Sequence, residues 1–504
     1  ISQLIYYCPH FIIIINIFLP QIYTFPMSIA VSEALDYSPK EISAGTYVFR
    51  TVNPENGQPT GVSRDSTYNT DFLLPNQVFN LSRSYLNFNV TLNDTTAADD
   101  GRWNQAHNGF LAPIDGLTLS TADNVKLVEM NNLPEYTKMV WRPETDLQEF
   151  LSFPCHSNSE VAVANVTEPG HLFHRIRAAN SIADAASYRA SSYHSSNENG
   201  TALAAAADGY TAVANYISSA AVMDHAAGGA LAYRVQLPLK LIYGSLFAVD
   251  KDLYFGQQLR LTVRWNQGSK FGARLGANAN LATAAPLASA DLNEAPSVTN
   301  VALRIAVETN EAVAAGIRTR VMTQGININV PFTHSWKAVS SGVAGSSDTV
   351  IRKFNRNHGA KLLRVICAIF GTKNTGKDYC SAYNVTSTKW SGYRTFLDSK
   401  PIPDDTLLMN DFSAYQYVAE KLKGSVLKDF KDWAAVPALI EDFSGVPHTK
   451  DYVKSDTMNS GLDLSTEREF ALQFTNVPAT VQPVFIWAVC QKQLTITAQG
   501  TSLM

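Results

Sequence analysis

The acidic side chains that could serve general acid–base catalysis occur as two short pairs. Asp250 and Asp252 flank Lys251 in a strand-like segment, and Glu308 and Glu311 lie three residues apart where a strand pattern ends. Alternate residues of a strand share one face, so the first pair could present two carboxylates together, as a hydrolase requires. The lysine between them is more typical of a solvated sheet edge, and the second pair is poorly placed on an ending strand. Neither pair is assigned a catalytic role.

Two other pairs have residue types found in metal sites or nucleophilic sites. His171 and His174 have a metal-like spacing, but no glutamate stands between them and no cysteine pair is near. A pair of surface-loop histidines is the preferred interpretation. Cys155 and His156 are sequence neighbours, which an extended backbone points to opposite faces, so they make a poor nucleophile–base pair.

Residues 371–378, GTKNTGKD, resemble a phosphate-binding loop, because they follow an apolar run and contain GxxxxGK. Such a loop needs Ser or Thr next, to hold the metal, and then a helix whose N-terminus faces the phosphates. Asp378 occupies that place and would repel phosphate, so a Gly/Asn hairpin or loop is preferred. The sequence contains no GxSxG, HExxH, GxGxxG or zinc-ribbon pattern. We therefore assign no catalytic, cofactor-binding or metal-binding residue.

One run of the chain is basic. No acidic residue lies between Asp348 and Asp378, and such a run could meet an acidic neighbour, anionic lipid or nucleic acid. The preferred interpretation is a charged edge strand, which blocks pairing between sheet edges. The basic residues are Arg352, Lys353, Arg356, Lys361, Arg364, Lys373 and Lys377.

The overall composition excludes several classes of protein. The 504 residues carry 40 Lys and Arg against 44 Asp and Glu, a net charge of −4 that rules out wrapping nucleic acid by bulk charge. Hydrophobic residues make up 45% and charged residues only 17%, which leaves apolar area for partners beyond a large core. Five cysteines without a CxxC pair favour free thiols and a reducing compartment. Six glycosylation sequons are expected by chance, at Asn80, Asn89, Asn93, Asn165, Asn199 and Asn384.

Strand patterns dominate the elements that would position these residues. Residues 85–92, 259–265 and 301–307 alternate between apolar and polar side chains, as strands with one buried face do. Residues 362–370 and 484–490 are continuous apolar runs, which predict strands buried on both faces. Turn-forming residues separate these runs throughout. The pattern predicts an all-β chain with long inserted loops and a few short helices.

The strand pattern repeats at long range and indicates two β-sandwiches in tandem. Each half runs through many strands and closes with a strand pair, which predicts one sandwich at 45–312 and a second at 313–504. The hinge would lie near residues 310–323. The one predicted helix covers about 413–434, where apolar residues recur every three or four positions until Pro437.

Two segments stand apart from this pattern. The segment at about 176–232 is alanine-rich, with thirteen alanines among the 32 residues 201–232, and is predicted to be a long insert in the first sandwich, a tower or a loop. Residues 1–44 are predicted to be an N-terminal arm. Its apolar run at 11–19 is too short to span a bilayer and has no basic residue before it. Two interpretations stay open: residues 1–26 precede a natural start at Met27, or they form an arm that docks on a neighbouring subunit or an internal membrane.

The strand motifs resemble those of double jelly-roll major capsid proteins of the adenovirus-like lineage, most of all those of polinton-like viruses and virophages. Residues 70–90, TDFLLPNQVFNLSRSYLNFNV, resemble the opening strands of the family. The resemblance covers roughly residues 45–500, and it lies in strand patterns rather than in invariant residues. The alanine-rich insert has no counterpart in it. The other similar segments are 237–239, Phe247, 250–251, 255–265, 301–308, 330–332, 362–370 and 393–398.

The resemblance implies a structural role without turnover. Such proteins form hexon-like homotrimers whose six jelly rolls give a pseudo-hexagonal capsomer, and these capsomers tile an icosahedral shell around double-stranded DNA. The implied partners are neighbouring capsomers, penton proteins and minor capsid proteins, with no sequence-specific nucleic-acid binding and no cofactor. The location would be the virion, after assembly inside the host cell. Contact with an internal membrane stays open.

Two other functions stay as alternatives. The first is a host-attachment or carbohydrate-binding β-sandwich protein, in which Tyr188, Tyr193 and Tyr210 of the insert would stack on sugars. The second is a glycan amidase built on two jelly rolls, which would need a cleft with paired carboxylates at the sandwich junction, where Glu308 and Glu311 lie.

Overall fold

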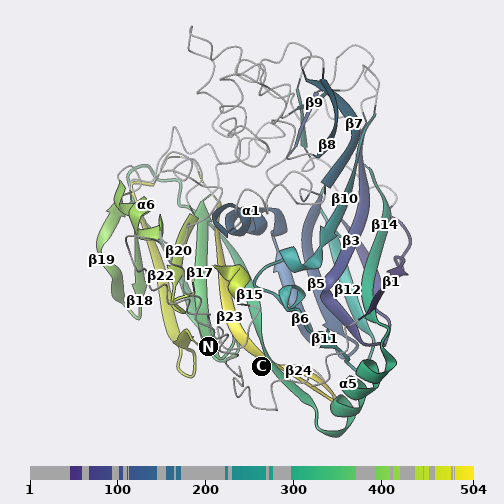
Figure 1. Ribbon diagram of the computed structural model, residues 1–504. Helices are drawn as coiled ribbons and strands as arrows, with labels where there is room; N and C mark the ends of the chain where they lie inside the picture. The colour runs from purple at the N-terminus through teal and green to yellow at the C-terminus, as the bar shows by residue number, and fades with distance from the viewer. Residues whose placement is uncertain are drawn as a thin grey trace, which may run out of the picture. The chain divides into compact units, whose positions relative to one another are not determined.

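The computed structural model describes parts of the chain from residue 46 to the C-terminus (Figure 1). The predicted N-terminal arm, most of the alanine-rich insert and the glycine-rich segment 371–378 lie outside the described residues. The described residues are 46–59, 67–93, 102–105, 111, 113–144, 155–163, 166–171, 222–224, 230–267, 272–275, 297–369, 392–408, 412–419, 438–446, 448–452, 460–477, 479, 481 and 483–504.

The strands of the N-terminal half form a first β-sandwich. One sheet has the order β1-β14-β3-β10-β7-β8, with β11 added on β3, and the other has the order β2-β12-β5-β6. Three short strands form a separate sheet, β13-β4-β9. The strand bounds are β1 (Tyr47–Val52), β2 (Tyr68–Leu73), β3 (Phe79–Asn93), β4 (Arg102–Gln105), β5 (Ile114–Thr121), β6 (Lys126–Asn131), β7 (Cys155–Val163), β8 (Val166–His171), β9 (Val222–Asp224), β10 (Ala230–Pro238), β11 (Asp252–Leu253), β12 (Leu259–Trp265), β13 (Gly272–Leu275) and β14 (Ser297–Glu308).

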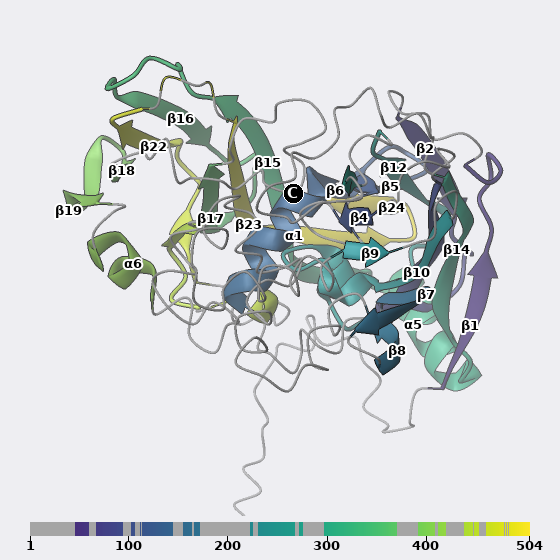
Figure 2. The same cartoon turned by 90° about the horizontal axis from the view of Figure 1, so that it is seen from above.

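The strands of the C-terminal half form a second β-sandwich. One sheet has the order β15-β23-β17-β20, with β21 added on β17 and β24 on β23, and the other has the order β16-β22-β18-β19 (Figure 2). The strand bounds are β15 (Ile326–Val339), β16 (Asp348–Phe354), β17 (Lys361–Ile369), β18 (Gly392–Leu397), β19 (Lys400–Leu408), β20 (Ala438–Asp442), β21 (Leu462–Asp463), β22 (Arg468–Thr475), β23 (Pro483–Thr497) and β24 (Gly500–Leu503).

The two sandwiches have the same strand order. If the eight main strands of each are counted along the chain, one sheet reads 1-8-3-6 and the other reads 2-7-4-5 in both sandwiches. Two four-stranded sheets connected in this way are a jelly roll. The strand order confirms the sequence-based prediction of two tandem jelly rolls. This repeated connectivity is not visible in residue identity.

The smaller elements repeat as well. A helix follows the fifth strand of each sandwich, namely α1 (Leu133–Glu144) after β6 and α6 (Phe412–Ala419) after β19. One or two 3-10 helices follow the sixth strand, namely η4 (Leu239–Leu241) and η5 (Leu246–Ala248) after β10, and η9 (Thr449–Asp451) after β20. A two-residue strand, β11 or β21, then pairs with the third strand before the seventh begins.

Burial along the strands agrees with the sequence pattern. In β12, Leu259, Leu261, Val263 and Trp265 are at most 1% exposed while the residues between them face outward. The Trp265 indole Nε1 donates to Thr70 Oγ1 at 2.7 Å, which satisfies a polar group inside the first core. In the second sandwich, every residue at 484–490 and 362–368 is buried, as predicted for strands covered on both faces.

The helices differ most from the sequence-based prediction. The described part of the helix predicted at 413–434 is α6, and residues 420–437 lie outside the described residues. Helix α5 (Glu311–Thr323) occupies the segment predicted as a hinge, and Asn310 caps it by accepting from the backbone N–H groups of Ala312 and Val313. The sandwich boundary at residue 312 stays a prediction. The connection there is helical because Asn310 caps it and because the buried Val313, Ile317 and Val321 recur every four residues along one face.

Two histidines lie in the aromatic core of the second sandwich. His334 of β15 donates from Nε2 to the backbone oxygen of His358 at 2.8 Å. Its ring lies 4.7 Å from the ring of Phe332 and 5.8 Å from that of Trp336, measured between centroids. Burial lowers the pKa of His334 to about 4; the hydrogen bond to His358 opposes this effect, and the charge of Lys492 adds to it.

This lowered pKa predicts a stability loss in acid. The folded chain holds His334 neutral below its ordinary pKa of 6.5, so its contribution is complete above about pH 6.5 and is lost as the pH falls toward 4. The variant His334→Gln keeps an N–H donor but cannot take up the proton. Between pH 7 and pH 4.5, the wild-type free energy of unfolding should fall by about 2 kcal/mol more than that of the variant. Urea titrations at a series of pH values measure the difference, and parallel profiles would contradict it.

Candidate functional site: the junction between the two sandwiches

The structure brings Asp250 and Asp252 together at one side chain, that of Asn80, an arrangement that the sequence left open. Strand β11 pairs with the start of β3 and places Asp252 opposite Asn80. The Asn80 side chain donates from Nδ2 to Oδ1 of Asp250 at 2.8 Å and to Oδ1 of Asp252 at 3.1 Å. Asn80 is only 2% exposed, so its glycosylation sequon is inaccessible in the folded chain.

Other donors engage both carboxylates. The Tyr47 hydroxyl donates to Asp252 at 2.8 Å, and Arg83 Nε donates to Asp250 at 3.2 Å. Burial favours a higher pKa for Asp250, but the hydrogen bonds from Arg83 and Asn80 outweigh it and the pKa is lowered. Burial raises the pKa of Asp252 in spite of its hydrogen bonds. The pair therefore ties β1, β3 and β11 together, and protein donors engage both carboxylates, although the Asp250 side chain is 58% exposed.

Glu308 and Glu311 do not form a pair. Glu308 ends β14 and its Oε1 accepts from the backbone N–H groups of Thr46 at 3.2 Å and Asn310 at 2.7 Å. Glu311 begins α5 and its carboxylate lies 3.1 Å from Arg318. The two carboxylates thus serve different local structures. The described residues around α5 do not supply the paired-carboxylate cleft that an amidase would need.

The basic run does not form one surface. Arg364 is fully buried, lies 3.8 Å from Asp442, and has its guanidinium 5.6 Å from the ring centroid of Tyr452. Lys353 lies on β16, at the edge of its sheet, and pairs with Glu467 at 3.0 Å. The edge-strand interpretation holds for Lys353, while Arg364 is a core residue that sequence alone did not reveal.

The other candidates of the sequence add no site. The strands β7 and β8 contain Cys155, His156 and His171, whose side chains the structure does not describe. In the described segments, no group of three or more His, Cys, Asp or Glu residues is placed to hold a metal ion. None of the helices within those segments is long and apolar enough to cross a bilayer. His174, Tyr188, Tyr193, Tyr210, Lys373 and Lys377 lie outside the described residues.

Among the described residues, a buried contact joins the two sandwiches. Strand β6, helix α1 and the η4–η5 segment of the first sandwich contact β15, β23 and η9 of the second. The hydroxyl of Tyr136 on α1 donates to the backbone oxygen of Tyr243 at 2.6 Å, and its ring lies edge-on to Trp487 of β23 at 5.8 Å. Thr333 of β15 donates from Oγ1 to the backbone oxygen of Gly244 at 2.8 Å.

This contact explains why β23 is buried on both faces. One face of its sheet packs against the partner sheet of the second sandwich, and the other carries Phe485 and Trp487, whose stacked rings lie 5.6 Å apart. Helix α1 covers this second face from the first sandwich (Figures 1 and 2). Tyr136 and Trp487 have no exposed surface and Thr333 is 2% exposed, so the contact is as dry as a domain core. The apolar run at 484–490 was the only sequence signal of this junction.

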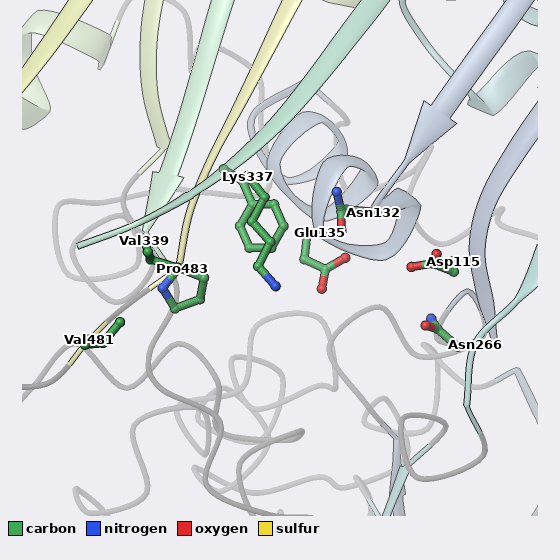
Figure 3. A pocket seen from close by; sticks show the side chains of 9 residues that line it. Asp115, Asn132, Glu135, Asn266, Lys337, Val339, Val481 and Pro483 are labelled. Carbon is green, nitrogen blue, oxygen red and sulfur yellow. The ribbon is translucent and has the colours of Figure 1, made fainter. Parts of the chain in front are cut away.

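Charges of opposite sign face each other at one end of the junction. A cavity of about 300 Å³ lies there, and Figure 3 shows Lys337 of β15 extending toward Glu135 of α1. Asp115 also lines the cavity from the first sandwich. Farther along, burial lowers the pKa of Lys492 on β23 while the charge of Glu129 on β6 opposes that effect. The first sandwich therefore places acidic groups near basic groups of the second, although Asp115 is also paired with Arg264 and Glu129 with Lys126, both within the first sandwich.

Gly244 lies at a point where the elements of the junction approach one another closely. Its φ of +69° lies in the left-handed region that favours glycine. A Cβ there would lie 2.7 Å from Thr333 Oγ1, 2.8 Å from the Tyr136 hydroxyl and 3.0 Å from Thr449 Cγ2. These three neighbours belong to β15, α1 and η9, so three of the elements that meet at the junction approach one glycine.

A matched pair of substitutions tests this close packing. Gly256 has a φ of +66°, yet a Cβ there would meet only Tyr254 Cε1 at 3.9 Å. Gly256→Ala should therefore cost only the backbone strain, about 1–2 kcal/mol. Gly244→Ala should cost about 1–3 kcal/mol more, because its methyl group overpacks the junction. Urea unfolding of both variants measures the difference, and equal losses would show that the junction is not tightly packed at Gly244.

Comparison with known proteins gives a match of structure alone. No protein-family model and no curated protein matches the sequence. The Faustovirus major capsid protein matches with a TM-score of 0.51 at 12% identity, over 92% of this chain and 92% of that chain. The PBCV-1 virus capsid protein, from a quasi-atomic model of the capsid, matches with a TM-score of 0.50 at 8% identity, over 92% of this chain and 98% of that chain.

A weaker match, to the mavirus major capsid protein, has a TM-score of 0.47 at 9% identity and covers 95% of this chain and 94% of that chain. The likeness of fold stands on the first two matches and on the repeated strand order. This chain therefore has the double jelly-roll fold, and it shares that fold with the major capsid protein of Faustovirus.

Proposed function

We propose that this chain is a major capsid protein. It assembles as homotrimers whose six jelly rolls form a pseudo-hexagonal capsomer, and these capsomers tile an icosahedral shell around double-stranded DNA in the virion. The observation that carries the proposal is the duplicated jelly roll with a dry junction between its halves. Two sandwiches held firmly in one chain give a three-fold assembly six similar walls.

The chemistry of the described residues supports a role in assembly. The carboxylates that the sequence singled out are engaged in holding strands and helix ends. The near balance of 40 basic and 44 acidic residues permits like subunits to pack without strong repulsion. Neighbouring capsomers, penton proteins and minor capsid proteins are the partners that the proposal implies.

The mass of the protein in solution tests the proposal. The chain of 55.1 kDa should form a species of about 165 kDa, three times that mass, in light scattering on a sizing column. The same species should show hexagonal outlines in negative stain. A form that begins at Met27 is measured beside the full chain, to show whether residues 1–26 are needed for the trimer.

A monomer at every concentration would overturn the proposal. Glycan-binding and amidase assays would then test the two alternative functions. A stable dimer would also contradict it, because two copies cannot supply six jelly rolls.

A further inference from the structure

Each sandwich contains counterparts of all the elements that form the internal junction, but inside the chain each sandwich contributes only some of them to that junction. Inside the chain, the fifth strand and following helix of the first sandwich, β6 and α1, pack on the first and eighth strands of the second, β15 and β23. The same order of strands gives each of these elements a counterpart. The counterparts of β6 and α1 are β19 and α6, and those of β15 and β23 are β1 and β14.

Some apolar side chains of the counterpart edge strands are exposed, whereas the apolar side chains of the junction strands named here are buried. In β6, Leu127 and Val128 are 1% exposed, whereas in β19 Leu408 is 42% exposed. In β15, Thr333 is 2% exposed, whereas Phe49 of β1 is 47% exposed. The exposed surface of β1 consists of Val48, Phe49, Arg50 and Thr51, with Arg304 of β14 beside them; we name it the β1 surface.

All four strands lie at the edges of their sheets. Strands β6 and β15 are edge strands that cover each other inside the chain. Strands β1 and β19 are edge strands with no described strand paired on their outer side, and helix α6 of the same sandwich contacts β19. An uncovered edge is a site of association between chains. Because Pro401 and Pro403 of β19 lack an N–H donor, this edge is suited to packing by side chains rather than to pairing as an added strand.

The signs of the charges on the exposed counterpart strands are the same as those at the internal junction. At the internal junction the fifth strand contributes Glu129 and the eighth strand contributes Lys492. On the exposed counterparts, β19 carries Asp404 and Asp405, and the β1 surface carries Arg50 and Arg304. In both cases the fifth strand carries acidic groups and the first or eighth strand carries basic ones, although Glu129 is also paired with Lys126 of β6 and β19 also carries Lys400.

We propose that the β1 surface of one copy packs against β19 and α6 of a second copy, and so repeats between chains the junction found inside each chain. This contact is head-to-tail, since it joins different surfaces of the two copies, and such contacts close into rings when the rotation allows. The inference rests on the proposed trimer and names the surfaces that build it. Phe49 and Leu408 would be its apolar contacts. The basic residues of the β1 surface and the acidic residues of β19 would fix its register.

Charge reversal tests the contact on the full chain. Arg50→Glu and Asp405→Lys each place like charges at the contact, so each should raise the concentration at which the trimer dissociates by about tenfold. The double variant restores opposite charges in every contact and should return dissociation toward the wild-type concentration. Arg356→Glu is the matched control, because this exposed arginine lies in a turn of the second sandwich away from β19, and it should leave the trimer unchanged.

A cross-linking experiment gives an independent measurement. In the variant Phe49→Cys/Leu408→Cys, a bismaleimide should join copies into covalent dimers and trimers on a denaturing gel. Phe49→Cys alone and Leu408→Cys alone should show only the background of the wild-type chain, because position 49 of one copy faces position 408 of the next.

The outcomes separate this inference from the proposed function. If the wild-type chain is a monomer at every concentration, both fail. If the wild type is a trimer that Arg50→Glu and Asp405→Lys leave unchanged and that the double-cysteine variant does not cross-link, the contact is wrong and the capsid proposal stands. Thermal unfolding at the wild-type temperature shows that a dissociated variant is still folded.

Discussion

The burial of the outer face of the sheet β15-β23-β17-β20 is the constraint on which the rest of the structure depends. A jelly roll normally has one face of each sheet available to water. Here Phe485 and Trp487 lie on that second face, and removing such rings from water contributes roughly 25 cal/mol per Å². Helix α1, which follows the fifth strand of the first sandwich, covers them. Separating the two sandwiches would expose these buried rings to water. The two halves therefore behave as one unit.

Polar groups in the junction fix its geometry rather than supply its energy. Each hydrogen bond, such as those from Tyr136 to Tyr243 and from Thr333 to Gly244, contributes a net ~1 kcal/mol. Leaving either donor unpaired in this buried site would cost more than that, so few alternative packings are tolerated. The hydrogen bonds to Asp250 and Asp252, which looked like candidates for acid–base chemistry, likewise fix local geometry. Their donors come from Asn80, Tyr47 and Arg83, and the pair secures a strand end.

Much of the fold was predictable from the sequence, and most of the junction was not. Period-two patterns at 85–92 and 259–265, and the unbroken apolar run at 484–490, predicted the strands and their burial. Helix α5 was missed although Asn310 could cap it and Val313, Ile317 and Val321 recur every four residues. Gly244 and Arg364 were missed because their roles depend on neighbours far away in the chain, Thr333 and Asp442 among them. Connectivity had to be known before those neighbours could be named.

The low sequence identity to proteins of the same fold follows from these forces. At 12% identity the Faustovirus protein still matches over 92% of this chain. A jelly roll requires mainly apolar side chains at alternate strand positions and turns of suitable length, which many sequences can supply. Requirements for particular residues arise where backbones approach closely or charges are buried, as at Gly244 and Arg364. A duplicated fold concentrates those requirements at the contact between its halves. The counterparts of that contact are free to change only if nothing packs on them, and the opposite charges of β1 and β19 are consistent with the contact between copies that we propose.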